Sequence, residues 1–214
     1  PSLLLLPAFG QVASNDDWVY GSAVKALIET GKLIVPVSTV TSLVTQTLWG
    51  SLFAWPLGAD FGTLRLSTAV LGFLGILAFH SLLDDEKPSI RLPLSFAFAF
   101  NPLVYALTPS FMSEIPALSL SLIALSFSRR SLDEKSVGLR GLWIGSLFSA
   151  LAYGTRQTTF FVPFAVSVFC YIRRPKDFRA QAAVLLMPFS FAVLHQLWLR
   201  LSHGPIPHAY AWLN

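Results

Sequence analysis

Residues 64 to 83 read LRLSTAVLGFLGILAFHSLL, a run of twenty residues whose ionisable side chains are Arg65 and His80. A helix needs about 20 mostly apolar residues to cross the ~30 Å hydrocarbon layer of a membrane. The stretch meets that length with few charges. It therefore predicts a membrane-spanning helix.

Further stretches along the chain meet or approach the same length. They cover residues 92–108, 115–128, 141–155, 158–172 and 180–201. Asn101 and Pro102 interrupt the first of these, which predicts a break or kink in that helix. Taken together, the stretches predict an all-α fold, a polytopic transmembrane helical bundle.

The composition of the whole chain also favours a membrane protein. Of its 214 residues, 54% are hydrophobic and 12% are charged, and the mean hydropathy is +0.61. One soluble domain of this size normally buries less apolar surface than that. The net charge of +4 gives little reason to expect a nucleic-acid partner, because membrane proteins collect Lys and Arg in cytoplasmic loops. The single cysteine, Cys170, excludes a disulfide framework or a Cys-based metal site within this chain.

Short polar segments between the predicted spans carry most of the basic residues. Three of them, residues 84–91, 129–140 and 173–179, fall at every second turn of the chain. They hold ten of the fifteen basic residues, namely Lys87, Arg91, Arg129, Arg130, Lys135, Arg140, Arg173, Arg174, Lys176 and Arg179. By the positive-inside rule these three loops are cytoplasmic, and the remaining segments face outward.

The N-terminal part of the chain predicts an outward loop rather than a complete span. Residues 1–10 read as the end of a truncated first span, so we expect the chain to be part of a longer protein. Residues 38–58 are half amphipathic and contain Trp, which suits a helix lying on the outer membrane surface rather than another span. The prediction is a single transmembrane domain over 1–214, with an outer loop at 11–63 and further spans within 64–201.

Two adjacent carboxylates, Asp16 and Asp17, follow the truncated span within the stretch SNDDWVY, residues 14–20. One interpretation is that Ser14 or Asn15 caps a short helix and that the Asp pair favours its positive N-terminal end. The other is catalytic, since the start of a helix also fixes a carboxylate in space near the lipid headgroups. The spacing leaves both interpretations open.

Three further charged residues lie at outward positions. Glu114 begins the span at 115–128, where it either faces water as a helix-start residue or serves a functional site. Arg156 and Arg65 each either anchor the chain at the membrane interface or bind a phosphate in bidentate fashion. Spacing alone favours anchoring for both arginines.

The four histidines give weaker signals. His80 and His195 lie within predicted spans, where a lone His is more often hydrogen-bonded to a neighbouring helix than a ligand. His203 and His208 lie outward without a nearby acid or Cys, which gives poor support for a metal site.

Several short motifs carry a resemblance to a known family. They are SNDDWVY at 14–20, GKLIVP at 31–36, LRLSTAVLG at 64–72, NPLVYALTPSFMSEIPAL at 101–118 and YGTRQ at 153–157. Their order over about residues 9–172 resembles the N-terminal half of membrane glycosyltransferases of the GT-C fold. Within that group the chain is most similar to the bacterial dolichyl-phosphate-mannose-protein mannosyltransferase-like family, which includes the aminoarabinose transferase that acts on lipid A.

The resemblance implies roles for individual residues. Asp16 matches the family's catalytic acid, Asp17 the neighbouring acidic position, and Tyr20 its tyrosine. Glu114 matches the acidic residue of the second outward loop, where the family more often has Asp. Arg156 matches a basic position near the lipid phosphate.

The same resemblance implies an enzyme and its partners. The implied activity is inverting transfer of a sugar from a polyprenyl-phosphate donor to a hydroxyl of a lipid, protein or glycan acceptor, at the outer face of the bacterial inner membrane. We expect Tyr20, Arg65, Arg156 and Gln157 to bind substrate. No cofactor is certain, and a divalent metal ion is left open.

Two other classes of protein compete with this interpretation. In a transporter or lipid-handling protein the same acids would line a translocation path, although coupled transporters usually place charges near the bilayer midplane. In a structural subunit, replacing Asp16 with Asn would leave function intact.

Overall fold

The computed structural model of the protein describes residues 16–34, 42–133, 138–173 and 175–203. Every regular element in these residues is a helix, which confirms the predicted all-α class. In chain order the elements are α1 (Asp17–Thr30), α2 (Val44–Leu57), α3 (Phe61–Leu82), α4 (Pro88–Ala99), α5 (Pro102–Leu107), α6 (Glu114–Asp133), α7 (Leu139–Tyr153), the short 3-10 helix η2 (Gln157–Phe160), α8 (Phe161–Arg173) and α9 (Phe178–His203).

The helices follow the apolar stretches of the sequence to within a few residues. The predicted break is present, because α4 stops at Ala99 and α5 starts at Pro102. The Asn101 side chain caps α5 by accepting a hydrogen bond from the Leu103 amide at 3.0 Å. Among the described residues two helices, α3 and α9, are long and apolar enough to cross a membrane.

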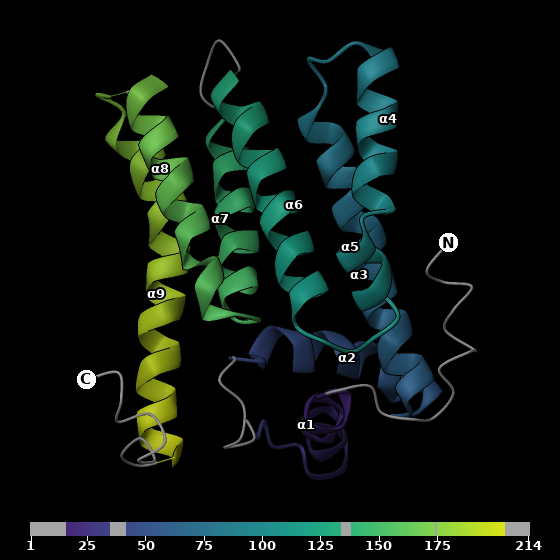
Figure 1. Ribbon diagram of the computed structural model, residues 1–214. Coiled ribbons are helices and arrows are strands. Elements are labelled where there is room, and N and C mark those ends of the chain that lie inside the picture. Colours follow the sequence, from purple (N-terminus) through teal and green to yellow (C-terminus); the bar gives the residue numbers. More distant parts are fainter. Residues whose placement is uncertain (1–15, 35–41, 134–137, 174, 204–214) are drawn as a thin grey trace, which may run out of the picture.

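Most of the helices run side by side in one bundle, and α2 crosses one end of it (Figure 1). Helix α1 lies beyond α2, on the side away from the bundle. We call the end of the bundle that α2 crosses the site end. It is made of α1, α2, the α5–α6 turn at 108–113 and the turn at 154–156. The C-terminal ends of α3, α6 and α8 lie at the opposite end, which we call the basic end. The described residues of the three predicted basic loops therefore share one end.

Small residues bring the central helices close together. Helix α6 packs between α3 and α7, and its buried positions are mostly Ser and Ala. A Cβ atom at Gly75 of α3 would lie 2.9 Å from the Cα of Ser119, and one at Gly145 of α7 would lie 2.9 Å from the carbonyl oxygen of Ala124. Helices that meet through small residues in this way gain close backbone packing.

Gly75→Ala should destabilise the protein, because the new methyl group meets backbone that cannot rotate away. Overpacking of this kind costs about 1–3 kcal/mol. Gly72→Ala on the same helix is the control, since there the nearest atom is a side-chain methyl of Ile115 at 3.2 Å. Thermal unfolding of the purified variants measures the difference; equal midpoints for the two would contradict the close packing of α3 on α6.

Large apolar side chains lie on the outside of the bundle. Exposed examples come from every long helix, including the central α6 and α7, and they include Phe73, Leu77, Phe96, Leu118, Leu147, Phe169, Leu186, Val193 and Leu197. Soluble monomers rarely expose contiguous apolar surface of more than a few hundred Å². In water, a protein normally buries its large apolar side chains. This bundle instead packs small residues between its central helices and exposes many large apolar side chains.

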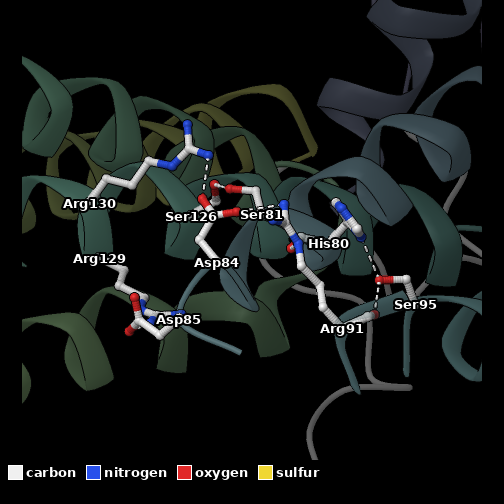
Figure 2. Close-up of polar contacts among 9 residues, drawn as sticks. All are labelled: His80, Ser81, Asp84, Asp85, Arg91, Ser95, Ser126, Arg129 and Arg130. Atoms are coloured by element: carbon white, nitrogen blue, oxygen red, sulfur yellow. Dashed lines mark hydrogen bonds and ion pairs between the residues drawn. The ribbon is translucent and has the colours of Figure 1, made fainter. Parts of the chain in front are cut away.

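Ion pairs at the basic end join the α3–α4 turn to the end of α6 (Figure 2). Asp84 lies 2.8 Å from the guanidinium of Arg130 and 2.5 Å from that of Arg91. Asp85 pairs with Arg129. Two acids thus neutralise most of the charge of three arginines that the sequence assigns to two separate loops.

The same corner contains His80, which bonds to the neighbouring helix α4 (Figure 2). Its Nδ1 lies 2.8 Å from the hydroxyl of Ser95, and that hydroxyl donates its proton to the carbonyl oxygen of Arg91 at 2.9 Å. With the serine proton on that carbonyl, His80 donates through Nδ1–H to the Ser95 oxygen, so this arrangement requires the Nδ1–H tautomer of His80. The interpretation of His80 as a helix-contact residue is confirmed.

Acid should weaken the ion pairs of Asp84. The hydrogen bond from Arg130, together with the charge of Arg91, lowers the pKa of the Asp84 carboxyl below its ordinary value of 3.8. A lowered folded-state pKa stabilises the fold fully above the ordinary value, and this contribution is lost as pH falls from there through the folded pKa. Asp84→Asn should therefore unfold more easily than wild type at pH 6, with the gap closing below about pH 4.

Denaturation midpoints measured against pH test this expectation. The control is Glu86→Gln, an exposed acid in the same turn that makes no ion pair with the described residues. A gap between Asp84→Asn and wild type that stays constant down to pH 2 would contradict it.

Candidate functional site

The site end begins with Asp16 and Asp17, which the structure separates. Asp16 occupies the N-cap position of α1 and its carboxylate is exposed, while Asp17 begins the helix and is buried. Successive residues of a helix point about 100° apart, so neighbouring side chains can face solvent and protein. The predicted caps Ser14 and Asn15 lie outside the described residues. Asp16 itself makes no side-chain capping bond.

Asp17 forms a buried ion pair with Arg65 of α3. The Asp17 Oδ2 atom accepts hydrogen bonds from Arg65 Nη2 at 3.0 Å and Nε at 3.2 Å, and both side chains are 0% exposed. The guanidinium also lies over the ring of Phe61. Buried charges are tolerated when they are paired and hydrogen-bonded in this way.

This pairing revises two expectations from the sequence. Asp17 was expected to act on substrate and Arg65 to bind a phosphate, yet neither side chain reaches solvent in this structure. Each neutralises the other inside the protein. Their observed role is to hold α1 against α3, which leaves Asp16 as the exposed member of the acidic pair.

The peptide of Phe111 links this ion pair to the loop that leads into α6. Its amide donates to Asp17 Oδ1 at 2.9 Å, and its carbonyl oxygen accepts from Gln46 Nε2 of α2 at 2.6 Å. The Phe111 ring is itself buried, in a cluster with Val24 and Leu64. Helices α1 and α2 therefore each bind one backbone polar group of Phe111, an arrangement that we call the Phe111 clamp.

Glu114, three residues after the clamp, forms an ion pair with Arg156 from the turn after α7. Three residues span at most about 11 Å, so the Glu114 backbone begins within that distance of the Phe111 residue that Asp17 binds. The Glu114 and Arg156 side chains are 37% and 32% exposed, and Arg156 Nη1 also lies 3.4 Å from the Ser113 hydroxyl. The second carboxylate oxygen of Glu114 is buried and has no hydrogen-bond partner among the described residues.

The Glu114–Arg156 pair has chemistry that the Asp17–Arg65 pair lacks. Water reaches both of its side chains, so an incoming anion can share the guanidinium. The second oxygen of Glu114 is buried in this structure but keeps unused hydrogen-bond acceptor capacity among the described residues. The sequence predicts both residues at outward turns; their direct contact is a finding of the structure.

The remaining predicted residues surround these pairs. Tyr20 is buried in the apolar cluster of the site end, and Gln157 begins η2 half-buried, next to Arg156. Sequence reasoning missed Gln46 and Ser113. Gln46 carried a usable signal, since it is the bulkiest of the polar side chains on the polar side of the predicted surface helix.

The histidines do not form a metal site in the described part of the chain. No group of three or more His, Cys, Asp or Glu side chains there is arranged to hold one ion. The hydrogen-bonding role predicted for His195 is wrong, because both ring nitrogens are buried without a partner, against the rings of Tyr153, Phe191 and Trp198. His208 lies outside the described residues, as does the side chain of His203.

Comparison with known proteins gives no match: no family model, no curated protein and no solved structure is similar to this chain.

Proposed function

We propose that the chain is a multi-pass membrane domain whose site end faces outward. The large apolar side chains exposed on the bundle support this, as do the two helices that are long and apolar enough to cross a membrane. Of the apolar window in α9, 22% is buried, against 56% in α3. The core helix of a soluble protein would be mostly buried, so α9 is better matched to lipid.

The orientation follows from charge. The basic end carries the three loops rich in Lys and Arg, which favours the cytoplasmic side. Helix α2 suits the opposite interface because its polar residues, including Gln46, face the protein, while Leu48, Leu52 and Trp55 are exposed. Trp55 is 85% exposed, and Trp prefers the level of the lipid headgroups.

The function that the site supports best is transfer of a sugar from a polyprenyl-phosphate donor to an acceptor hydroxyl. The observation that carries it is the half-exposed Glu114–Arg156 pair, which follows the Phe111 clamp in the chain and is tied through it to α1, the helix that the exposed Asp16 precedes. The motif order that resembles GT-C glycosyltransferases adds support. An outward acid, an accessible cation and a lipid boundary are what such a transfer needs.

The residues divide the chemistry as follows. Asp16 accepts the proton of the acceptor hydroxyl while its oxygen attacks the anomeric carbon of the sugar. The bond from that carbon to the phosphate oxygen breaks, and the lipid phosphate leaves with the electron pair. Arg156 stabilises the charge that gathers on the phosphate. Glu114 orients the acceptor, and attack opposite the leaving group inverts the sugar's configuration.

The test uses the full-length protein reconstituted in vesicles with a panel of polyprenyl-phosphate sugars. Transfer of a labelled sugar to an acceptor supports the proposal. Failure with every donor, in protein that is folded and inserted, would overturn it. Movement of labelled lipid between leaflets without transfer would instead favour the transporter alternative.

Glu114→Gln should lower transfer partially, because it keeps a hydrogen-bond acceptor but releases Arg156 from its counter-charge. We expect a loss of about tenfold, since an orienting hydrogen bond to a charged group is worth about 1.5 kcal/mol. Donor titration with each variant separates effects on KM from effects on kcat. The control is Glu29→Gln, an exposed acid near the end of α1 that pairs with Lys25.

A further inference from the structure

Two corners of the basic end differ in how their positive charge is compensated. Where α3 meets α6, the arginines pair with Asp84 and Asp85 (Figure 2). Where α7 meets α9, the exposed Arg140, Lys176 and Arg179 form no ion pair with any described residue. We call the second region the open corner, made of Arg140, Lys176 and Arg179.

An apolar cluster at this end brings these basic residues together. Leu142 of α7, Cys170 of α8 and Ala180 of α9 are all fully buried in one core. Arg140 precedes Leu142 by two residues, and Arg179 directly precedes Ala180. Because a helix rises 1.5 Å per residue, each charge lies within about one turn of the shared core. The open corner thus lies at the end of the core that α7, α8 and α9 share.

Among the described side chains near the open corner, the acid is Asp177. It accepts a hydrogen bond from the Ala180 amide at 3.1 Å, which caps α9. Of the described side chains, three positive charges at the open corner thus stand against one negative charge. The local field therefore attracts anions, whereas the α3–α6 corner is largely compensated.

Apolar side chains accompany the positive charge. Phe178 is 82% exposed, and Tyr171 and Ile172 at the end of α8 are exposed as well. The guanidinium of Arg173 lies 4.9 Å from the ring centroid of Phe169, which keeps it at the level of the aromatic residues. Basic groups mixed with exposed aromatic and aliphatic side chains match a membrane surface, which offers anionic headgroups above acyl chains.

We propose that the open corner binds the headgroups of anionic phospholipids in the cytoplasmic leaflet. The proposal rests on the membrane placement proposed above but not on transferase activity. Because the two corners of the basic end differ in charge, the proposal places the bound lipid phosphates at the ends of α7, α8 and α9. The compensated α3–α6 corner does not compete for them.

The experiment titrates the full-length protein in neutral detergent with phosphatidylglycerol and follows the thermal unfolding midpoint. Phosphatidylcholine serves as the neutral lipid. Each basic residue near a membrane surface contributes about fivefold to such binding, so Arg140→Gln with Arg179→Gln should weaken the apparent affinity for phosphatidylglycerol about 25-fold. The matched control, Arg129→Gln with Arg130→Gln, removes the same formal charge from the compensated corner and should weaken it less than about fivefold.

Two results would overturn the proposal. One is an equal loss of affinity for phosphatidylglycerol in both double variants, which would mean that the lipid is attracted by the net charge of the protein and not by the open corner. The other is an equal rise in the midpoint with inorganic phosphate, which would assign the open corner to a soluble anion. Lys176→Gln with Arg179→Gln repeats the test at two exposed positions if the first pair unfolds. Protein that stays soluble without detergent would refute the membrane placement separately, whatever the transfer assay gives.

Discussion

Asp17→Ala should lower the free energy of unfolding by about 3–5 kcal/mol, the largest loss of stability that we expect from one substitution at the site end. The change leaves the Arg65 guanidinium buried without its counter-charge, and it removes the acceptor of the Phe111 amide. An unpaired buried charge costs far more than the pair itself contributes. Denaturant unfolding of the purified variant measures the loss.

A double variant distinguishes this explanation from simple loss of packing. Arg65→Met alone should be strongly destabilising, because it leaves the Asp17 carboxylate buried with the Phe111 amide as its remaining partner among those described. Asp17→Leu combined with Arg65→Met removes both charges and should cost clearly less than the sum of the two single changes. Additive effects would mean that the two charges are not coupled, against the geometry of the pair.

Asp16→Asn should lower sugar transfer by about 10²–10⁴-fold while leaving stability unchanged. General base catalysis contributes about that factor, and Asn has no basic oxygen to accept the proton. The substitution is nearly isosteric, and the exposed Asp16 side chain makes no capping bond that the change could break. The reconstituted transfer assay and a thermal melt together measure both quantities.

Asp17→Asn is the natural companion to that measurement. It changes the adjacent carboxylate in the same way, yet we expect its main effect on the unfolding midpoint, because Asp17 is buried against Arg65. Transfer at wild-type rate by Asp16→Asn would remove the catalytic role from the acidic pair. It would leave the fold and the lipid-binding proposal untouched.

Length and hydropathy were enough to predict the helices of the bundle from α3 onward. The stretch at 64–83 became α3 because twenty mostly apolar residues with one arginine near the start leave few alternatives to a buried or lipid-facing helix. The break at Asn101 and Pro102 followed from the missing amide of proline. The alternation of basic loops also predicted which turns share an end.

Contacts between residues far apart in the chain could not be predicted from the sequence. Asp17 and Arg65 are 48 positions apart, and Glu114 and Arg156 are 42 apart. No local pattern states which face of a helix meets which neighbour. One signal was nevertheless available for the first pair: an arginine inside an apolar stretch needs a counter-charge when it is buried. Arg65 therefore pointed to a nearby acid, and Asp17 was among the few candidates.

The Phe111 clamp links the position of α2 to that of Glu114, three residues further along the chain. A shift of α2 relative to the bundle must either carry the Phe111 backbone with it or break its bond to Gln46. A buried carbonyl left without a donor costs about 1–3 kcal/mol, which favours moving together. With α2 at the membrane surface and the transferase activity as proposed, tension applied through Trp55 would reach Glu114, and the thickness and lateral pressure of the lipid would then alter the geometry of the proposed reaction.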